Sequence, residues 1–174
     1  LDGIDRIRDT AEAHERSFVI EVMGRHSGFI ALAVGTGGGA EEILIPETPT
    51  EAGALAQRLK ANWERGKRSN LIVVAEGDES GGAAALAQQL KEHGLSPRVT
   101  ILGHLQRGGR PTAADRILAT ELGAYAVEAM RQGHTGVMAG MVGDSLTLTP
   151  FADCIGKKKP VNQQLVTLAR ILAT

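Results

Sequence analysis

Apolar residues repeat with helical spacing at the start of the chain and then gather into a short run typical of a strand. Leu1, Ile4, Ile7 and Ala11 recur every three or four residues, which predicts one apolar face on a charged helix. The β-branched run at 17–22 follows and predicts a strand. The chain therefore opens with a helix and then a strand.

Predicted helices and strands alternate through the rest of the chain. Further strands are expected at 43–45, 71–75, 98–102, 137–142 and 146–148, and further helices at about 26–34, 50–66, 80–94, 112–131 and 161–172. The run 71–75 is almost wholly apolar, which is typical of a parallel strand buried on both faces. Thr50 is expected to cap its helix, and Thr112 and Asp115 have the spacing of a capping box. The alternation predicts an α/β fold, a parallel sheet with helices on both faces in three αβα layers.

Composition narrows the class of protein. The 174 residues suffice for one domain, or at most for one and a half. Nineteen Lys and Arg against twenty Asp and Glu leave a net charge of −1, so neither nucleic acid nor a membrane surface is expected as a partner. The single Cys154 excludes an internal disulfide and favours the cytoplasm. Because the sequence does not begin with Met, we expect it to be a piece of a longer chain.

Three predicted strands are each followed by a short polar segment with glycine. These segments are 23–26 (Met-Gly-Arg-His), 76–77 (Glu-Gly) and 103–109 (Gly-His-Leu-Gln-Arg-Gly-Gly). The carboxyl ends of parallel strands meet at one edge of a sheet, where ligands bind. We therefore expect two arginines, two histidines and a carboxylate to gather at this edge.

The chemistry of these residue types indicates a small phosphorylated polyol as ligand. The guanidinium fork of arginine matches phosphate oxygens, and glycine lets backbone N–H groups approach an anion. A carboxylate accepts hydrogen bonds from sugar hydroxyls. Taken singly, Arg25 or Arg107 would be read as a surface arginine, His26 or His104 as a structural or solvated histidine, and Glu76 as a charge at a helix start. Only their convergence at one edge favours the ligand site.

A second polar set lies before the strands, at the opposite edge. Its members are Arg8, Arg16, Glu41, Arg65, Lys67, Arg68 and Arg98. A strand of five residues separates the two edges by roughly 15 Å or more, so one small ligand cannot contact both sets within one subunit. The second set is either solvated, or serves a second site, or completes the site of a neighbouring subunit. The last two alternatives favour an oligomer.

Five motifs closely resemble the C-terminal half of bacterial 6-phosphofructokinases. They are Glu-Val-Met-Gly-Arg-His-Ser-Gly at 21–28, Ile-Pro-Glu at 45–47, Val-Ala-Glu-Gly at 74–77, Leu-Gly-His-Leu-Gln-Arg-Gly-Gly at 102–109 and Asp-Arg at 115–116. The similarity covers essentially the whole chain in order and spacing. It implies a phosphofructokinase-like fold and the transfer of the γ-phosphoryl group of ATP to the 1-hydroxyl of fructose 6-phosphate in glycolysis, with Mg²⁺ accompanying the nucleotide and no organic prosthetic group.

The resemblance implies a role for each matching residue of the substrate site. The implied sugar-phosphate residues are Arg16, Met23, Gly24, Arg25, Glu76, Arg98, His104, Leu105, Gln106 and Arg107. Arg25 would also stabilise charge in the transition state, and Glu76 would take sugar hydroxyls. Arg16 and Arg98 match two arginines that, in this family, reach across a subunit interface to the 6-phosphate.

The resemblance also implies an effector site for ADP or phosphoenolpyruvate at another interface of a homotetramer. Its implied residues are Arg8, Gly39, Ala40, Glu41, Arg65, Lys67, Arg68 and Ser69. Glu41 would face the Mg²⁺ of the effector. The implied division of the chain is a small sugar-phosphate and effector domain at 1–104, a segment at 105–155 that returns to a larger nucleotide domain, and a helix at 156–174 that returns to the small domain.

Some features depart from the family pattern and leave alternatives open. Neither the glycine-rich nucleotide loop nor the catalytic aspartate motif of the family occurs here, so we expect this chain to be inactive alone. Phe29 resembles the pyrophosphate-using relatives as much as the ATP-using ones. Arg68, Arg110 and the glycines at 37–39 differ from the best-known bacterial enzymes, which puts the effector response in doubt. A non-catalytic regulatory module that binds a phosphate ligand is the alternative from another class.

Overall fold

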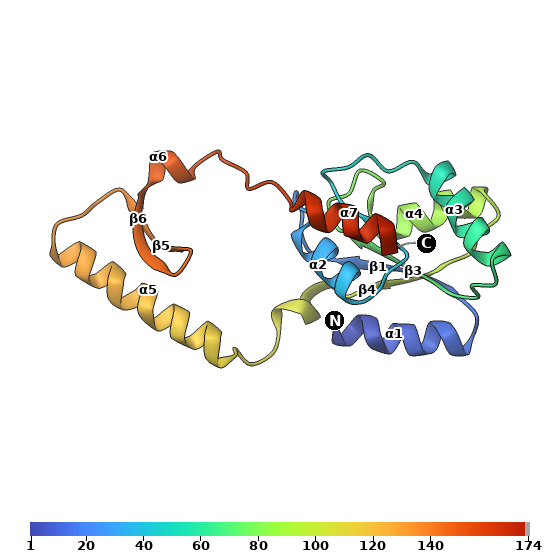
Figure 1. Ribbon diagram of the computed structural model, residues 1–174, viewed down its shortest axis with the longest axis horizontal. Coiled ribbons are helices and arrows are strands. Elements are labelled where there is room, and N and C mark those ends of the chain that lie inside the picture. Colours follow the sequence, from blue (N-terminus) through green and yellow to red (C-terminus); the bar gives the residue numbers. More distant parts are fainter. Residues whose placement is uncertain (173–174) are drawn as a thin grey trace. The chain divides into compact units, whose positions relative to one another are not determined.

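The computed structural model describes residues 1–172, and the chain divides into two compact units. The first unit comprises residues 1–108 and the segment that begins at Val161; the second comprises Gly109–Pro160. Residues 173 and 174, the end of the last predicted segment, lie outside the described residues. Figure 1 labels the elements of both units.

The first unit is built on a four-stranded parallel sheet. Its elements in chain order are α1 (Asp2–Ala13), β1 (Ser17–Val22), α2 (Phe29–Gly37), β2 (Glu42–Leu44), α3 (Ala52–Glu64), β3 (Asn70–Ala75), α4 (Gly82–Glu92), β4 (Arg98–Ile101), the 3₁₀ helix η1 (Gly103–Arg107) and α7 (Gln163–Leu172). The strand order is β2-β3-β1-β4. In the register of β1, Phe18 lies opposite both Leu71 of β3 and Arg98 of β4. The predicted parallel sheet is confirmed, and the carboxyl ends of β1, β3 and β4 share one edge.

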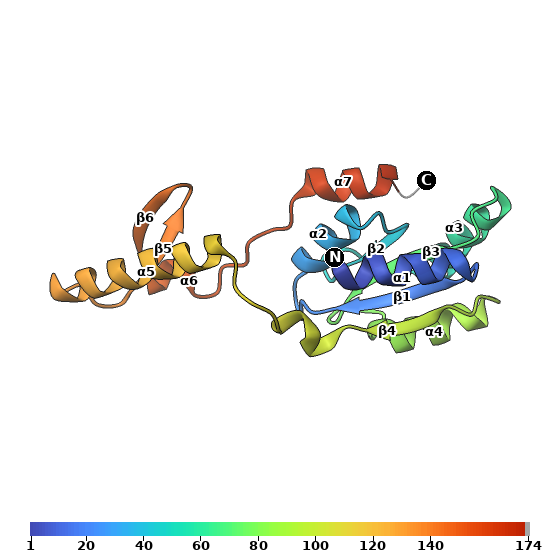
Figure 2. The ribbon, with the colours of Figure 1, turned by 90° about the horizontal axis from the view of Figure 1, so that it is seen from below.

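Helices cover both faces of this sheet, because alternate strand residues bury their side chains in two separate cores. Ile20 of β1 and Val73 of β3 pack with residues of α1, α2 and α7. Val19 and Ile72 point to the other face and pack with residues of α3 and α4. Figure 2 shows α2 and α7 on one side of β1 and α4 on the other. The predicted arrangement of three layers is therefore confirmed.

The second unit contains α5 (Ala113–Arg131), β5 (Val137–Val142), β6 (Ser145–Pro150) and the short α6 (Phe151–Cys154). The expected capping box is present at the start of α5, where Thr112 and Asp115 exchange hydrogen bonds. The strands β5 and β6 pair antiparallel, so the expectation of a parallel sheet throughout the chain is wrong here. Two residues connect these strands, and so short a connection can join only antiparallel neighbours.

Helix starts in the first unit differ from the sequence-based predictions by two or three residues. The helix α2 begins at Phe29 and α4 at Gly82, after the glycine-bearing turns that precede them. The residue at the N-cap of α3 is Glu51, and the expected cap at Thr50 is wrong. The Thr50 hydroxyl donates instead to Asp78 at 3.1 Å, so it holds the loop after β3.

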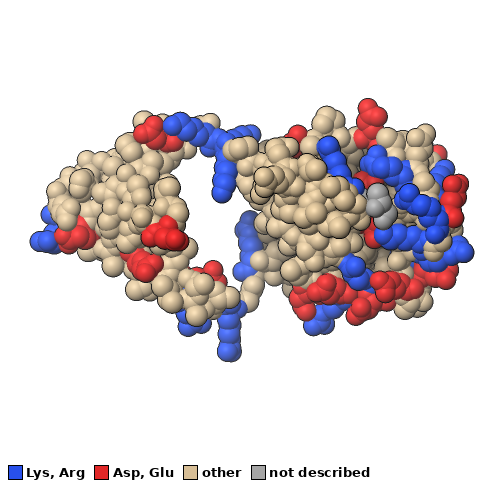
Figure 3. All heavy atoms as spheres, in the orientation of Figure 1, with Lys and Arg blue, Asp and Glu red and all other residues tan. Residues whose placement is uncertain are grey.

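Charged side chains of both signs are interspersed over the surface of the first unit that Figure 3 shows, in keeping with the net charge near zero. Within residues 1–172, no helix combines the length and the apolar character needed to cross a bilayer.

Candidate functional site

The loops that follow β1 and β3 are joined at the carboxyl edge of the sheet. The Glu76 N–H donates to the Val22 carbonyl at 2.9 Å, which continues the pairing of the two strands by one residue. The Leu102 N–H donates to the Glu21 carbonyl at 3.1 Å and ties the loop after β4 to the same strand. The structure thus brings all three predicted segments to one edge.

A tight turn fixes the backbone of Arg25. The Gly24 carbonyl accepts hydrogen bonds from the Ser27 N–H at 3.0 Å and from the Ser27 hydroxyl at 3.3 Å. Within this turn Arg25 has a φ of 47°, in the left-handed region that residues with a side chain rarely adopt. Such strain is retained where the surrounding structure imposes it, and it is concentrated at functional sites.

Arg25 and Glu76 face each other across the edge. The Arg25 Nε lies 3.9 Å from the Glu76 Oε1; the Arg25 side chain is 81% exposed and that of Glu76 is 31% exposed. An exposed ion pair of this kind is weak, so a ligand can separate the two groups at little cost. The site therefore offers a cation for a phosphate beside a carboxylate for hydroxyl groups.

Gly77 explains why the two loops lie so close. A Cβ atom at Gly77 would stand 1.3 Å from the Arg25 carbonyl oxygen. At that distance the two atoms would overlap, so no residue with a side chain fits at this position. The sequence showed a glycine after Glu76, but only the structure shows that the backbone of the Arg25 turn fills the space.

The 3₁₀ helix η1 carries the remaining residues of the predicted substrate site. The Met23 N–H donates to the Gln106 Oε1 at 3.2 Å, and the Gln106 Nε2 donates to the Gly103 carbonyl at 3.1 Å. Gln106 thereby ties η1 to the loop after β1, and the Met23 N–H already has a protein acceptor. His104 and Arg107 are three residues apart, so they share one side of the 3₁₀ helix, and both are exposed. Leu105 is 82% exposed.

Arg16 and Arg98 lie at the opposite, amino edge of the sheet. Arg16 precedes β1, and Arg98 is the first residue of β4. Both are exposed, and the length of β1 separates them from the Arg25 turn by roughly 15 Å or more. A cavity of about 470 Å³ opens at this edge, with Arg16 and Trp63 in its lining. The structure does not bring these two arginines to the carboxyl edge of their own subunit.

The predicted effector residues also gather near the amino edge. A Cβ atom at Gly39 would lie 3.1 Å from the Arg8 Nη2, so the guanidinium of Arg8 covers this glycine. The Arg68 guanidinium lies over the Trp63 ring, 5.5 Å from its centroid. Ala40 is buried and Ser69 half-buried.

Glu41 does not fit a metal ligand in this arrangement. Its Oε1 lies 2.9 Å from the Lys67 Nζ, and its Oε2 accepts a hydrogen bond from the Leu71 N–H. The carboxylate is buried, and both oxygens have protein partners. Over residues 1–172, no three His, Cys, Asp or Glu side chains gather in a way that could hold a metal ion. We therefore assign no Mg²⁺ to Glu41.

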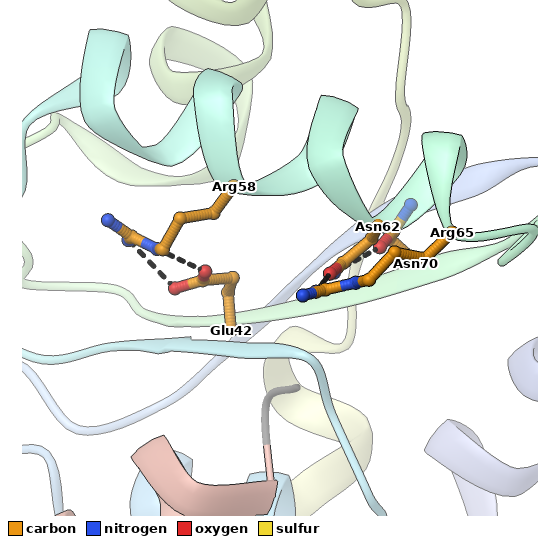
Figure 4. Close-up of polar contacts among 5 residues, drawn as sticks. All are labelled: Glu42, Arg58, Asn62, Arg65 and Asn70. Atoms are coloured by element: carbon orange, nitrogen blue, oxygen red, sulfur yellow. Dashed lines mark hydrogen bonds and ion pairs between the residues drawn. The ribbon is translucent and has the colours of Figure 1, made fainter.

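Three residue pairs that involve α3 or the residue after it make polar contacts that were not foreseen from the sequence (Figure 4). Glu42 of β2 forms a bidentate ion pair with Arg58, with Nε–Oε1 and Nη2–Oε2 distances of 2.5 and 2.9 Å. The hydrogen bond to Glu42 raises the pKa of Arg58, against the opposing effect of burial. Further along α3, Arg65 donates to Asn62, whose amide in turn donates to Asn70 of β3. The pairs that join α3 to the sheet, Arg58–Glu42 and Asn62–Asn70, are 16 and 8 residues apart and leave no local signal, so only the packing of α3 on the sheet reveals them.

Comparison with known proteins matches this chain to phosphofructokinases. A family model described as "Phosphofructokinase" matches residues 1–130. The "ATP-dependent 6-phosphofructokinase 1" of Thermus thermophilus is 55% identical over 174 residues, which cover 99% of this chain and 54% of that relative. The chain spans about half the length of the curated relatives that it matches.

Solved structures match the fold along nearly the whole chain. The structure of phosphofructokinase from Saccharomyces cerevisiae matches with a TM-score of 0.77 and 36% identity, covering 99% of this chain and 25% of that one. A pyrophosphate-dependent phosphofructokinase from Nitrosospira multiformis matches with a TM-score of 0.75 and 22% identity, covering 98% of this chain and 51% of that one. The second likeness shows the fold alone.

Proposed function

Because the chain belongs to the phosphofructokinase family, we propose that the full-length protein transfers the γ-phosphoryl group of ATP to the 1-hydroxyl of fructose 6-phosphate. The observation that carries this proposal is the meeting of Arg25 and Glu76 at the carboxyl edge of the sheet. A phosphate and several hydroxyls are what this pair of groups can bind together.

In this proposal each side chain of the edge acts on a different part of the sugar phosphate. Glu76 accepts hydrogen bonds from sugar hydroxyls, and Arg25 neutralises charge that develops on the transferred phosphoryl group. His104 and Arg107 extend the site along η1, and Gln106 holds η1 against Met23. The nucleotide enters as its Mg²⁺ complex, and the group that accepts the hydroxyl proton is not among the residues assigned here.

The amino-edge arginines complete the site of a neighbouring subunit. Arg16 and Arg98 lie too far from Arg25 to contact the same sugar phosphate in one subunit. In a homotetramer they bind the 6-phosphate across an interface. The cationic side chains of Arg8, Arg65 and Lys67, the last of which pairs with Glu41, bind an anionic effector, ADP or phosphoenolpyruvate, so the enzyme is allosteric. As a glycolytic enzyme it acts in the cytoplasm.

ATP is the proposed phosphoryl donor, because the curated relatives with 45–55% identity are named ATP-dependent. The test is an assay of the purified full-length protein with fructose 6-phosphate and Mg²⁺, supplied in parallel with ATP or with pyrophosphate. Turnover with ATP supports the proposal. Turnover with pyrophosphate alone would make pyrophosphate the phosphoryl donor, and no turnover with either refutes the proposal. The 174-residue chain alone is expected to show no turnover in the same assay.

A further inference from the structure

The two helices that follow the site loops begin without a capping side chain of their own. The helix α2 follows the Arg25 turn, and its N-cap residue is Gly28; α4 follows the Glu76 loop, and its N-cap residue is Gly81. The first N–H groups of a helix have no partner within the helix, and the cap side chain normally supplies one. Glycine has no such side chain, so a protein acceptor for these N–H groups can come only from another part of the fold.

Glu47 supplies the acceptor for α2. Both carboxylate oxygens of Glu47 lie 3.0 Å from the Gly28 nitrogen and accept its N–H. No side chain fits at Gly28, because a Cβ atom there would stand 2.3 Å from the Ile45 Cγ2. The close approach of α2 to the end of β2 therefore requires a glycine at the cap and a carboxylate from the neighbouring loop.

Glu21 supplies the acceptor for α4 in the same way. Its Oε2 accepts the Ala83 N–H at 2.8 Å, although Glu21 belongs to β1 and lies 62 residues away in sequence. A Cβ atom at Gly82 would stand 2.7 Å from this oxygen. A carboxylate at a helix N-terminus also gains from the partial positive charge there.

We propose that Glu47 and Glu21 are positioning residues, which lie outside the sugar-phosphate site and hold in place the two loops that carry Arg25 and Glu76. Glu47 fixes the end of the turn that carries Arg25, and Glu21 fixes α4 and the loop that carries Glu76. Both act through backbone N–H groups and do not touch the ligand. The identity of that ligand rests on the proposed function, whereas the capping itself rests on the contacts alone.

The kinetic test compares Glu47→Ala and Glu21→Ala with Asn162→Ala in the full-length protein. Asn162 caps α7 by accepting from the Gln164 and Leu165 N–H groups, so its loss removes a cap that belongs to no site loop. A cap of ordinary strength contributes a free energy that corresponds to a change of about fivefold in a rate or equilibrium constant. Glu47→Ala should lower both kcat and kcat/KM for fructose 6-phosphate by this factor, because Arg25 contacts the transferred group. Glu21→Ala should raise the KM alone, and Asn162→Ala should change neither.

Two rescues distinguish positioning from a general loss of stability. Glu47→Gln and Glu21→Gln keep an acceptor oxygen and should recover most of the activity that the alanine variants lose. Formate, a free carboxylate, should bind at the vacated helix start and partly restore Glu47→Ala while leaving Asn162→Ala unchanged. If the glutamine variants are as impaired as the alanine variants and formate has no effect, positioning through the N–H groups is refuted.

Amide hydrogen exchange tests the same proposal without any reaction. Exchange should quicken about fivefold for residues 24–30 in Glu47→Ala and for residues 77–84 in Glu21→Ala, and in neither segment for Asn162→Ala. Unchanged exchange in both segments overturns the proposal. If wild type fails to phosphorylate fructose 6-phosphate but the exchange pattern is found, the proposed function fails and the capping stands.

Discussion

The side-chain amide of Asn62 donates a hydrogen bond to the side-chain oxygen of Asn70 at 3.1 Å, and both residues are almost wholly buried. The Asn70 amide then donates to the Ser17 hydroxyl at 3.3 Å. These three residues belong to α3, β3 and β1, so one chain of hydrogen bonds ties a helix to two strands at the amino edge. The arginines predicted to act across subunit interfaces lie beside this chain, since Arg16 precedes Ser17 and Arg65 donates to Asn62.

Asn70→Ala should lower the free energy of unfolding by about 1–3 kcal/mol, because it leaves the buried amide of Asn62 without its acceptor. Urea unfolding of wild type and variant measures the difference. Ser17→Ala removes the acceptor of the Asn70 amide at the half-buried end of the chain, where water can replace the hydroxyl, and should cost less. Equal losses for the two variants would contradict this account of the buried pair.

Gly77→Ala should separate the two loops of the candidate site, because the added Cβ would overlap the Arg25 carbonyl oxygen. Displacement of catalytic groups by about 1 Å lowers activity by as much as 10²-fold, so a loss of that order in kcat/KM for fructose 6-phosphate is expected. Gly53→Ala, at a helical position where the added Cβ would meet only the His93 ring at 3.6 Å, is the control and should leave the kinetics unchanged. Normal kinetics in Gly77→Ala would show that the loops need not touch.

Arg98→Ala should raise the KM for fructose 6-phosphate in the full-length enzyme far more than the KM for ATP. The reason is the expected contact of Arg98 with the 6-phosphate of a neighbouring subunit. Arg65→Ala, at the same edge, is the matched comparison and should alter the response to ADP or phosphoenolpyruvate with basal turnover nearly intact. An unchanged sugar-phosphate KM in Arg98→Ala would remove the shared site from the proposal.

Asp115 should stabilise the second unit at neutral pH, and this stabilisation should be lost in acid. Hydrogen bonds from the Thr112 hydroxyl and backbone N–H lower the pKa of the Asp115 carboxyl from its ordinary value of 3.8. A carboxyl whose pKa is lower in the folded state stabilises fully above the ordinary value, and the stabilisation is lost as the pH falls through the folded value. Urea unfolding of wild type and Asp115→Asn should therefore differ at neutral pH and converge in strong acid. If the free energies of unfolding of wild type and Asp115→Asn still differ in strong acid, the effect of the substitution comes from packing and not from the charge of Asp115.

The sequence predicted the elements whose signal is local. The buried run at β3, the apolar face of α1 and the capping box at Thr112 and Asp115 each need only neighbouring residues, and all are confirmed. Parallel pairing then sufficed to bring Arg25 and Glu76 to one edge.

What the sequence did not show depends on contacts between distant segments. The Gly28 N–H donates to Glu47, 19 positions away, and the Ala83 N–H donates to Glu21, 62 positions away. Both glutamates stood in recognised motifs with no role attached. The cap of α3 was misplaced because the Thr50 hydroxyl bonds Asp78 of another loop. Glycines before helices, together with a carboxylate on a neighbouring strand (Glu21) or in a neighbouring loop (Glu47), are the signals that could have predicted these caps.

The central claim, that the carboxyl edge of the sheet binds a phosphosugar, is tested most directly by a crystal structure of the full-length protein with fructose 6-phosphate. The account predicts sugar hydroxyls within hydrogen-bond distance of the Glu76 carboxylate, with the Arg25 guanidinium turned from Glu76 toward the reacting end of the sugar. Fructose 6-phosphate bound elsewhere, with Arg25 and Glu76 still facing each other, would contradict it.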